Sequence, residues 1–228
     1  MLEKSEPTKA ERLMSVSTLD QCRTSEETAN RITHAVGIVL AVAATAVLAI
    51  FAGIHGSARA IVSGSIFGAT LILLYTASTL YHGARNPRTR AILQTLDHCA
   101  IFLLIAGTYT PFALVTLHGP QGWFLFAAIW GMAIFGIVFE MTPWRRHRMV
   151  SLALYLGMGW AVVAVISPLQ ARIEPGGLIL LVAGGIAYTA GVFFYLFPKI
   201  PYHHAIWHLF VLVGSTLHFL AILFFVIT

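Results

Sequence analysis

Long apolar stretches separated by short polar breaks make up most of this 228-residue chain. A membrane-spanning helix needs about 20 consecutive, mostly apolar residues, and seven stretches come close to that length or exceed it. They cover residues 33–54, 60–81, 97–117, 122–140, 149–168, 176–197 and 205–227. Breaks rich in glycine, proline and polar residues separate them. The pattern predicts an all-α, polytopic membrane protein with seven transmembrane helices, and the short connections make consecutive helices antiparallel neighbours.

The composition supports a membrane protein with one domain. Hydrophobic residues make up 58% of the chain and charged residues only 10%, whereas a soluble domain carries about 25% charged residues. The net charge of +5 does not indicate a nucleic-acid partner, because the basic residues lie in short loops between apolar stretches. We expect a polar N-terminal tail over residues 1–25, without the apolar core of a cleaved signal peptide, and a membrane domain over residues 26–228. Cys22 in the tail and Cys99 in an apolar stretch predict no structural disulfide.

The basic residues predict the orientation in the membrane. Twelve of the 14 Lys and Arg residues fall in the N-terminal tail and in the second, fourth and sixth loops. Only Arg59 and Arg172 fall on the opposite side. Because positive residues concentrate in cytoplasmic loops, we expect the N-terminus in the cytoplasm and the C-terminus outside.

Polar residues suited to metal binding or catalysis gather at the predicted cytoplasmic ends of the apolar stretches. Ionisable side chains are rare at membrane depth and usually indicate a functional site. Since alternating helices bring these ends to one side of the bilayer, we expect the side chains to converge there. They are Glu27, Asn30, His34, His82, Asp97, His204 and His208.

A zinc site is the chemistry that this pattern favours. His204 and His208 are four residues apart and therefore share one helix face, an arrangement that zinc sites use. His82 is the best third ligand, which leaves the fourth position for water, as in catalytic zinc sites. Ser78, one turn before His82, can orient a ligand or water. Asp97 can act as a general base or coordinate the metal directly.

Simpler structural roles are alternatives for several of these residues. Asp97 is also a favourable helix N-cap, Ser78 can bond its own helix backbone, and Glu27 to Asn30 can be a solvated helix start. Glu140, close to basic residues, is expected to be a boundary residue. Histidines near helix ends often lie at the membrane interface, which is the alternative for His34, His98 and His203.

Four motifs, in order along the chain, resemble those of the hemolysin III family, within the wider progestin and adipoQ receptor group that includes the adiponectin receptors. They are Glu27-x-x-Asn30-x-x-Thr33-His34, Ser78-x-x-x-His82, Leu96-Asp97-His98 and His204-x-x-x-His208. The resemblance covers about residues 26–227. It implies seven helices in the inner (plasma) membrane with the N-terminus inside.

The resemblance also implies roles for the motif residues. Zinc would be held by His82, His204 and His208, with Asp97 beside the water of the site and Ser78 in support. Eukaryotic relatives resemble ceramidases, which are zinc amidases, and bacterial members have been linked to membrane-lipid homeostasis. Several relatives carry an acidic residue inside the last motif, where this chain has Ala205, so one proton-transfer group is missing here.

The hypothesis that follows is a zinc-dependent hydrolase that cleaves an amide or ester bond of a membrane lipid. One alternative is a non-enzymatic sensor or regulator of membrane fluidity, in which zinc only joins the second and seventh helices. The other is a pore-forming, hemolytic protein. The sequence gives the pore little support, because no apolar stretch has the polar face that a water-filled pore needs.

Overall fold

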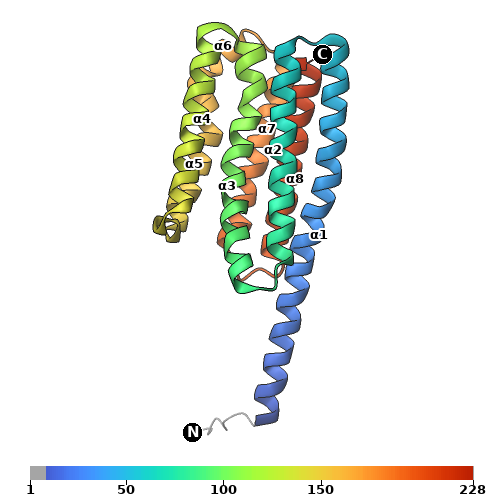
Figure 1. Ribbon diagram of the computed structural model, residues 1–228, viewed down its shortest axis with the longest axis vertical. Helices are drawn as coiled ribbons and strands as arrows, with labels where there is room; N and C mark the ends of the chain where they lie inside the picture. Colours follow the sequence, from blue (N-terminus) through green and yellow to red (C-terminus); the bar gives the residue numbers. More distant parts are fainter. Residues whose placement is uncertain (1–8, 228) are drawn as a thin grey trace.

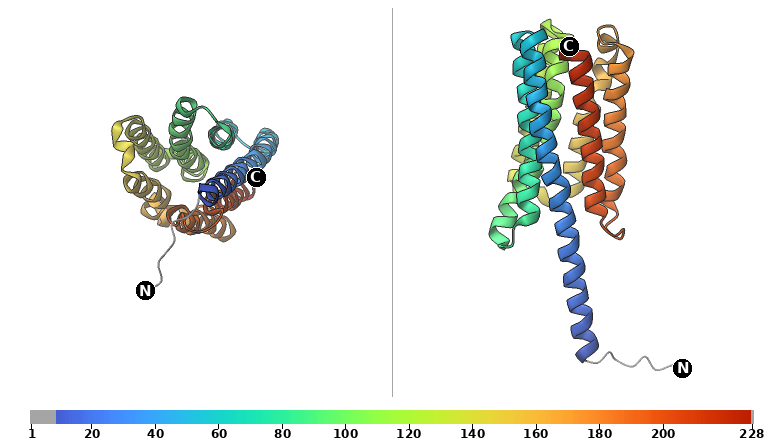
Figure 2. Two further views of the ribbon diagram at one scale, coloured as in Figure 1. Left: turned by 90° about the horizontal axis from the view of Figure 1, so that it is seen from below. Right: turned by 90° about the vertical axis from the view of Figure 1, so that its right-hand side faces the viewer.

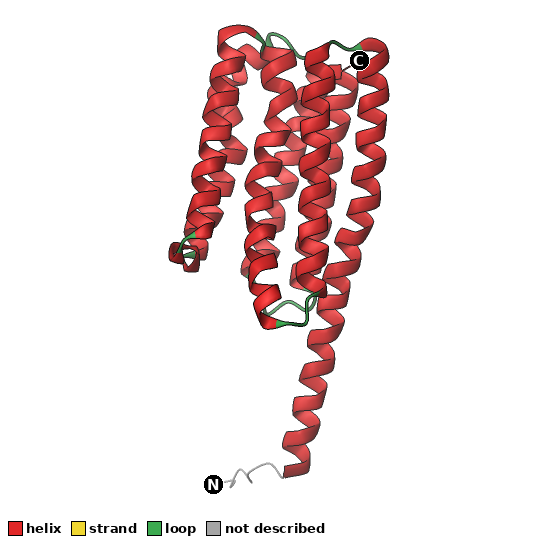
Figure 3. Cartoon of the chain, in the orientation of Figure 1, coloured by secondary structure: helices red, strands yellow, loops and turns green. Residues whose placement is uncertain are grey.

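A computed structural model describes residues 9–227 of the chain, with side chains from residue 24 onward. Within this part of the chain, seven helices are long and apolar enough to cross a membrane. They cover Thr24–His55, Ala58–Gly83, Pro87–Leu117, Gly119–Met141, Arg148–Gln170, Pro175–Leu196 and His203–Ile227. The prediction of an all-α protein with seven spans is therefore confirmed, and no strand occurs among the described residues (Figure 3).

The helices extend beyond the apolar stretches that predicted them. The first is the longest, and the third, fifth and seventh spans each contain a change of helix type. The α-helices are α1 (Lys9–His55), α2 (Ala58–Gly83), α3 (Pro87–Pro111), α4 (Gly119–Met141), α5 (Arg148–Gly159), α6 (Ile166–Gln170), α7 (Pro175–Leu196) and α8 (His203–Ile222). Two π-helical turns continue α3 and α8, namely η1 (Phe112–Leu117) and η4 (Leu223–Ile227). Two 3₁₀ segments, η2 (Pro143–Arg146) and η3 (Trp160–Val165), lie before and after α5.

The helices surround a common interior. Seen along the bundle, they follow one another around a ring (Figure 2), and α8 returns to pack against both α7 and α1. Between η3 and α7, the indole nitrogen of Trp160 donates a hydrogen bond to Thr189 Oγ1 over 3.0 Å. At the start of α5, the Arg148 guanidinium lies 5.2 Å from the ring centre of Tyr195 on α7. Inward-facing side chains of several helices line a shared cavity.

One end of the bundle carries nearly all the basic loops. The loops between α2 and α3, α4 and α5, and α7 and α8 lie at the end from which the first turns of α1 project (Figure 1). These loops and turns contain the basic residues that predict the cytoplasmic side. We call this the α2–α3 end, and its orientation toward the cytoplasm remains a prediction.

The start of α3 corrects one alternative for Asp97. The helix begins ten residues before Asp97, where Asn86 Oδ1 accepts hydrogen bonds from the backbone N–H groups of Arg88 and Thr89 over 2.9 and 3.2 Å. Pro87 occupies the first helical position, where its missing N–H has no consequence. Asp97 is therefore not an N-cap, and its carboxyl lies inside the membrane-spanning segment.

Close helix packing depends on glycine at several positions, and α4 offers a matched test. A Cβ added at Gly122 would lie 2.1 Å from the backbone oxygen of Ala113, whereas one at Gly131 would meet nothing within 4 Å. We expect Gly122→Ala to destabilise the protein by about 1–3 kcal/mol, because backbone cannot move aside as a side chain can. Gly131→Ala should be neutral or slightly stabilising, since alanine favours helix. Thermal unfolding in detergent measures both, and equal effects would contradict this packing.

Candidate metal centre

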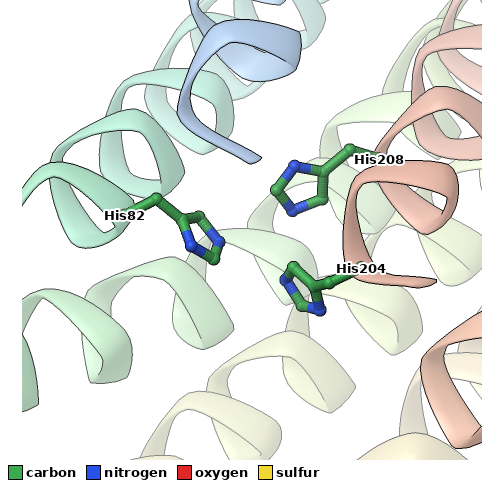
Figure 4. A group of neighbouring side chains, drawn as sticks. All are labelled: His82, His204 and His208. Carbon is green, nitrogen blue, oxygen red and sulfur yellow. The ribbon is translucent and has the colours of Figure 1, made fainter. Parts of the chain in front are cut away.

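Three histidines from two helices converge at the α2–α3 end. His82 lies in the last turn of α2, and His204 and His208 lie in the first two turns of α8. One nitrogen from each ring lies within 4.8 Å of the other two. The ring centres of His82 lie 5.0 Å from His204 and 5.1 Å from His208. Figure 4 shows the three rings turned toward one another across the space between α2 and α8.

An ion-pair chain orients the first of these rings. Glu27 Oε2 lies 2.7 Å from His82 Nδ1, and the other carboxylate oxygen accepts a hydrogen bond from Arg90. An ionised carboxylate only accepts hydrogen bonds, so Nδ1 of His82 is the donor in this pair and Nε2 is the nitrogen left for a metal. His82 Nε2 is buried without a hydrogen-bond partner. Glu27 is thus a partner of the site and not merely a solvated helix start.

The first helix orients His208 in the same manner. Nδ1 of His208 donates to the backbone oxygen of Asn30 over 3.1 Å and lies 3.1 Å from Thr33 Oγ1. The Thr33 hydroxyl itself donates to the Asn30 carbonyl, so its oxygen can accept from the ring. This places the proton on Nδ1 and leaves Nε2 as a free acceptor. His208 is almost fully buried, with 2% of its surface exposed.

His34 lies inside the site and not at the membrane interface. Its ring stacks on that of His208 with 3.5 Å between centres and packs edge-on against Tyr75. Both ring nitrogens of His34 are buried without hydrogen-bond partners. The interface alternative for His34 is therefore wrong, and its ring forms one wall of the site.

Asp97 and Ser78 face a cavity whose wall includes two of the three converging histidines, His204 and His208. The cavity has a volume of about 160 Å³, and its wall includes His34, Ser78, Asp97, His204 and His208. Ser78 is fully buried, and its hydroxyl makes no hydrogen bond to its own helix. The backbone role considered for Ser78 is thus not seen, and its side chain lies close to the Asp97 carboxyl.

The cavity runs along the bundle from charged to apolar surroundings. Its wall includes Arg145 and Arg148 near the α2–α3 end, and Leu117 and Leu169 near the opposite end. Between these ends the lining is mainly aliphatic and aromatic. An extended apolar molecule can therefore occupy the cavity with one end close to Asp97 and the histidines.

The donor set fits a zinc ion. Three imidazoles are ligands that zinc accepts, and three protein ligands leave a position for water or substrate. The pairs Glu27–His82 and Asn30–His208 match the outer hydrogen bonds that fix a zinc-bound ring. The buried, unpaired Nε2 of His82 is costly in a dry site, and a metal ion would satisfy it.

Two other predicted residues lie around the site in different roles. His98 on α3 has its Nδ1 3.3 Å from Glu140 Oε2 and is partly buried. His203 donates from Nδ1 to the backbone oxygen of Phe194 over 3.0 Å, so its ring packs against α7. His203 is absent from the converging group, because neighbouring residues on an α-helix point about 100° apart and His204 faces the site.

Sequence reasoning underestimated Glu140 and missed the roles of two other residues. Glu140 lies at the end of α4 as expected, yet only 1% of its surface is exposed, and it accepts hydrogen bonds from His98 and Ser151. An acid within an apolar stretch is the signal that could have identified it. Arg90 gave no such signal, and Thr33 was named only as part of the first motif, because both act on the site through partners distant in sequence.

Comparison with known proteins finds one matching family and relatives that cover most of the chain. The sequence model of the family described as Haemolysin-III related matches residues 22–219. Hemolysin-3 of Bacillus cereus is 48% identical over 202 residues, which span 89% of this chain and 92% of that protein. The Hemolysin-3 homolog of Bacillus subtilis (strain 168) is 47% identical over 88% of this chain and 94% of its own length. The human Monocyte to macrophage differentiation factor is 31% identical over 86% of this chain and 83% of its own.

Proposed function

This chain belongs to the haemolysin-III-related family of integral membrane proteins, and we propose that it is a zinc-dependent hydrolase of membrane lipids. The observation that carries the proposal is the convergence of three imidazoles beside a largely apolar cavity, whose wall includes two of them, His204 and His208, and the buried Asp97 carboxyl. The proposed bond is an amide or ester. The proposed setting is the inner leaflet of the plasma membrane, where such hydrolysis would adjust lipid composition.

In this proposal His82, His204 and His208 hold the zinc. When bound, zinc supplies a Lewis acid that polarises a carbonyl and lowers the pKa of a water toward about 7. Glu27 and the Asn30 carbonyl keep the His82 and His208 rings in the orientation and tautomer that ligation requires. The protein thereby contributes a rigid, preoriented set of ligands.

Asp97 is the proposed general base. Its carboxyl lines the cavity beside Ser78 and can take the proton of an attacking water as the water oxygen bonds to the carbonyl carbon. The same proton then passes to the leaving nitrogen or oxygen as its bond to carbon breaks. Ser78 positions the Asp97 carboxyl or the water. The products are a fatty acid and an amine or alcohol.

The cavity accounts for a lipid substrate. Its apolar length toward Leu117 and Leu169 suits an acyl chain, whose burial is favourable by about 0.8 kcal/mol per methylene group. Its charged end, with Arg145 and Arg148, suits the polar headgroup. A lipid held in this way has its carbonyl at the level of the histidines.

Hydrolysis by the purified protein tests the proposal. The protein is placed in vesicles that contain a ceramide, as the amide, or phosphatidylglycerol, as the ester. We expect mass spectrometry to detect free fatty acid from at least one lipid, and expect chelation to stop its release and added zinc to restore it. Zinc-loaded protein that releases fatty acid from neither lipid would contradict the proposal.

The Glu27 carboxylate offers a separate prediction for metal affinity. We expect Glu27→Gln to weaken zinc binding by roughly 10–100-fold, as loss of such an outer partner typically does, because the amide cannot replace the charge beside His82. Zinc competition with a fluorescent chelator measures the change. Glu174→Gln, at an exposed position outside the site, is the matched control and should bind zinc as the wild type does.

A further inference from the structure

A second polar group lies deeper in the bundle than the metal centre. His218 is on α8, ten residues beyond His208, which corresponds to about 15 Å along the helix axis. Its ring packs 5.5 Å from that of Tyr188 on α7, and the Tyr188 hydroxyl lies 2.7 Å from Ser215 Oγ. His218 and Tyr188 both line the cavity that reaches the metal centre. We call His218, Tyr188 and Ser215 the deep polar cluster.

The hydrogen bonds of His218 leave one of its ring nitrogens without a partner. Nε2 lies 3.0 Å from the backbone oxygen of Leu181, and because a carbonyl only accepts, Nε2 carries the proton. Nδ1 is then an acceptor, and it is buried without a partner. Since 8% of the His218 surface is exposed, bulk water does not satisfy this nitrogen. An unpaired acceptor in an apolar interior is unfavourable.

The packing around His218 is specific. A Cβ added at Gly184 would lie 2.3 Å from His218 Cδ2, so glycine at this position lets the ring approach α7. The hydroxyl of Tyr75, on α2, is likewise buried and has no hydrogen bond within 3.5 Å, although it lies near Ser215 of the cluster. Two unpaired polar atoms in a membrane-spanning bundle indicate a functional site more strongly than one.

We infer that the deep polar cluster binds a hydroxyl group carried in the middle of a lipid acyl chain, with His218 Nδ1 as the acceptor. The inference rests on the proposed function, because it assigns a feature to the lipid of that same cavity. A chain that begins at the metal centre and follows α8 passes His218 well before its end. The acceptor nitrogen requires a donor, so a hydroxyl fits and a keto oxygen does not.

Binding of free fatty acids tests the inference without relying on hydrolysis. Three fatty acids are compared: stearate, hydroxystearate with a mid-chain hydroxyl, and the matching ketostearate. Wild-type protein in detergent is incubated with two of them at a time, in equimolar amounts. Native mass spectrometry gives the relative occupancies. We expect hydroxystearate to bind about 3–10-fold more tightly than stearate, the range for one hydrogen bond, and ketostearate to gain nothing.

Two variants test whether His218 Nδ1 causes the preference for hydroxystearate. His218→Phe keeps a ring of similar size but removes the acceptor, and it should bind hydroxystearate and stearate equally. His55→Phe, at an exposed position at the end of α1, is the matched control and should keep the preference. The three-probe comparison uses the wild type alone, so it remains decisive if His218→Phe does not fold.

Three results would overturn the inference: equal binding of the hydroxylated and plain chains by the wild type, a preference that persists in His218→Phe, or no fatty-acid binding. Equal binding would mean that a water alone satisfies Nδ1. Preferential binding by a protein that hydrolyses no lipid would support the inference while contradicting the proposed function. Hydrolysis of a lipid without any preference for hydroxystearate would support the proposed function and contradict the inference.

Discussion

Chelation is expected to lower the melting temperature of the wild-type protein strongly and that of His208→Ala little. A metal present at 1,000 times its dissociation constant stabilises the folded state by about 4 kcal/mol, which corresponds to roughly 10 °C for a chain of this size. On chelation, His82 on α2 and the two histidines of α8 would lose the metal ion that they share. Differential scanning fluorimetry with and without chelator measures both shifts.

The melting temperatures with and without chelator are compared within each variant, because the substitution itself changes stability. His208 is buried, is hydrogen-bonded to Asn30 and stacks on His34, so its replacement lowers stability even without a metal. The difference between the melting temperatures with and without chelator, taken within one variant, does not include this loss of stability. His55→Ala serves as the control and should keep the full shift. Equal chelator shifts in the wild type and His208→Ala would show that these histidines do not hold the metal.

Asp97→Asn is expected to keep the metal and lose about 10²–10⁴-fold in hydrolysis, the range for removal of a general base. Asparagine has nearly the same shape as aspartate, so the cavity wall and the Ser78 contact should persist, while the amide cannot accept a proton. Fatty-acid release per bound zinc measures the effect. Turnover at the wild-type rate in zinc-loaded Asp97→Asn would exclude Asp97 as the base.

The same variant separates the hydrolase from a regulator with a purely structural metal. If zinc only joins α2 and α8, Asp97→Asn should leave membrane fluidity control intact. If the protein acts by hydrolysis, the variant should behave as a deletion in cells while remaining folded and zinc-loaded. Membrane fluidity, measured with a fluorescent probe, therefore discriminates between the two functions.

The number of helices and the convergence of the motif residues could be predicted because both follow from local patterns. Apolar stretches long enough to cross a bilayer are explicit in the sequence, and short connections fix their alternation. The four-residue spacing of His204 and His208 defines a helix face directly. His82 joins them because α2 ends where α8 begins, which alternation alone implies.

Helix ends could not be predicted in the same way. Hydropathy detects the part of a helix inside the hydrocarbon, whereas α3 begins at Pro87, and its first turns include charged and polar residues such as Arg88, Arg90 and Gln94. The predicted start at residue 97 suggested a cap for Asp97 that the structure contradicts. Similarly, α1 begins at Lys9, within the stretch predicted as a polar tail.

Pairings between distant residues also lay beyond sequence reasoning. Glu27 and His82 are 55 residues apart, and Glu140 and His98 are 42 apart, so no periodic pattern connects them. Glu140 was interpreted from its basic sequence neighbours, whereas its surroundings are set by α3 and α5. The deep polar cluster joins α7 and α8 through side chains that each looked isolated in the sequence.

The central claim is that His82, His204 and His208 hold a metal ion, and the most direct test is the amount of bound metal. Elemental analysis of protein extracted in detergent without chelator should find about one zinc per wild-type chain and far less in His208→Ala. His55→Ala should match the wild type. A well-folded wild-type protein without metal, which also takes up none from added zinc, would contradict the metal centre and the hydrolase built on it.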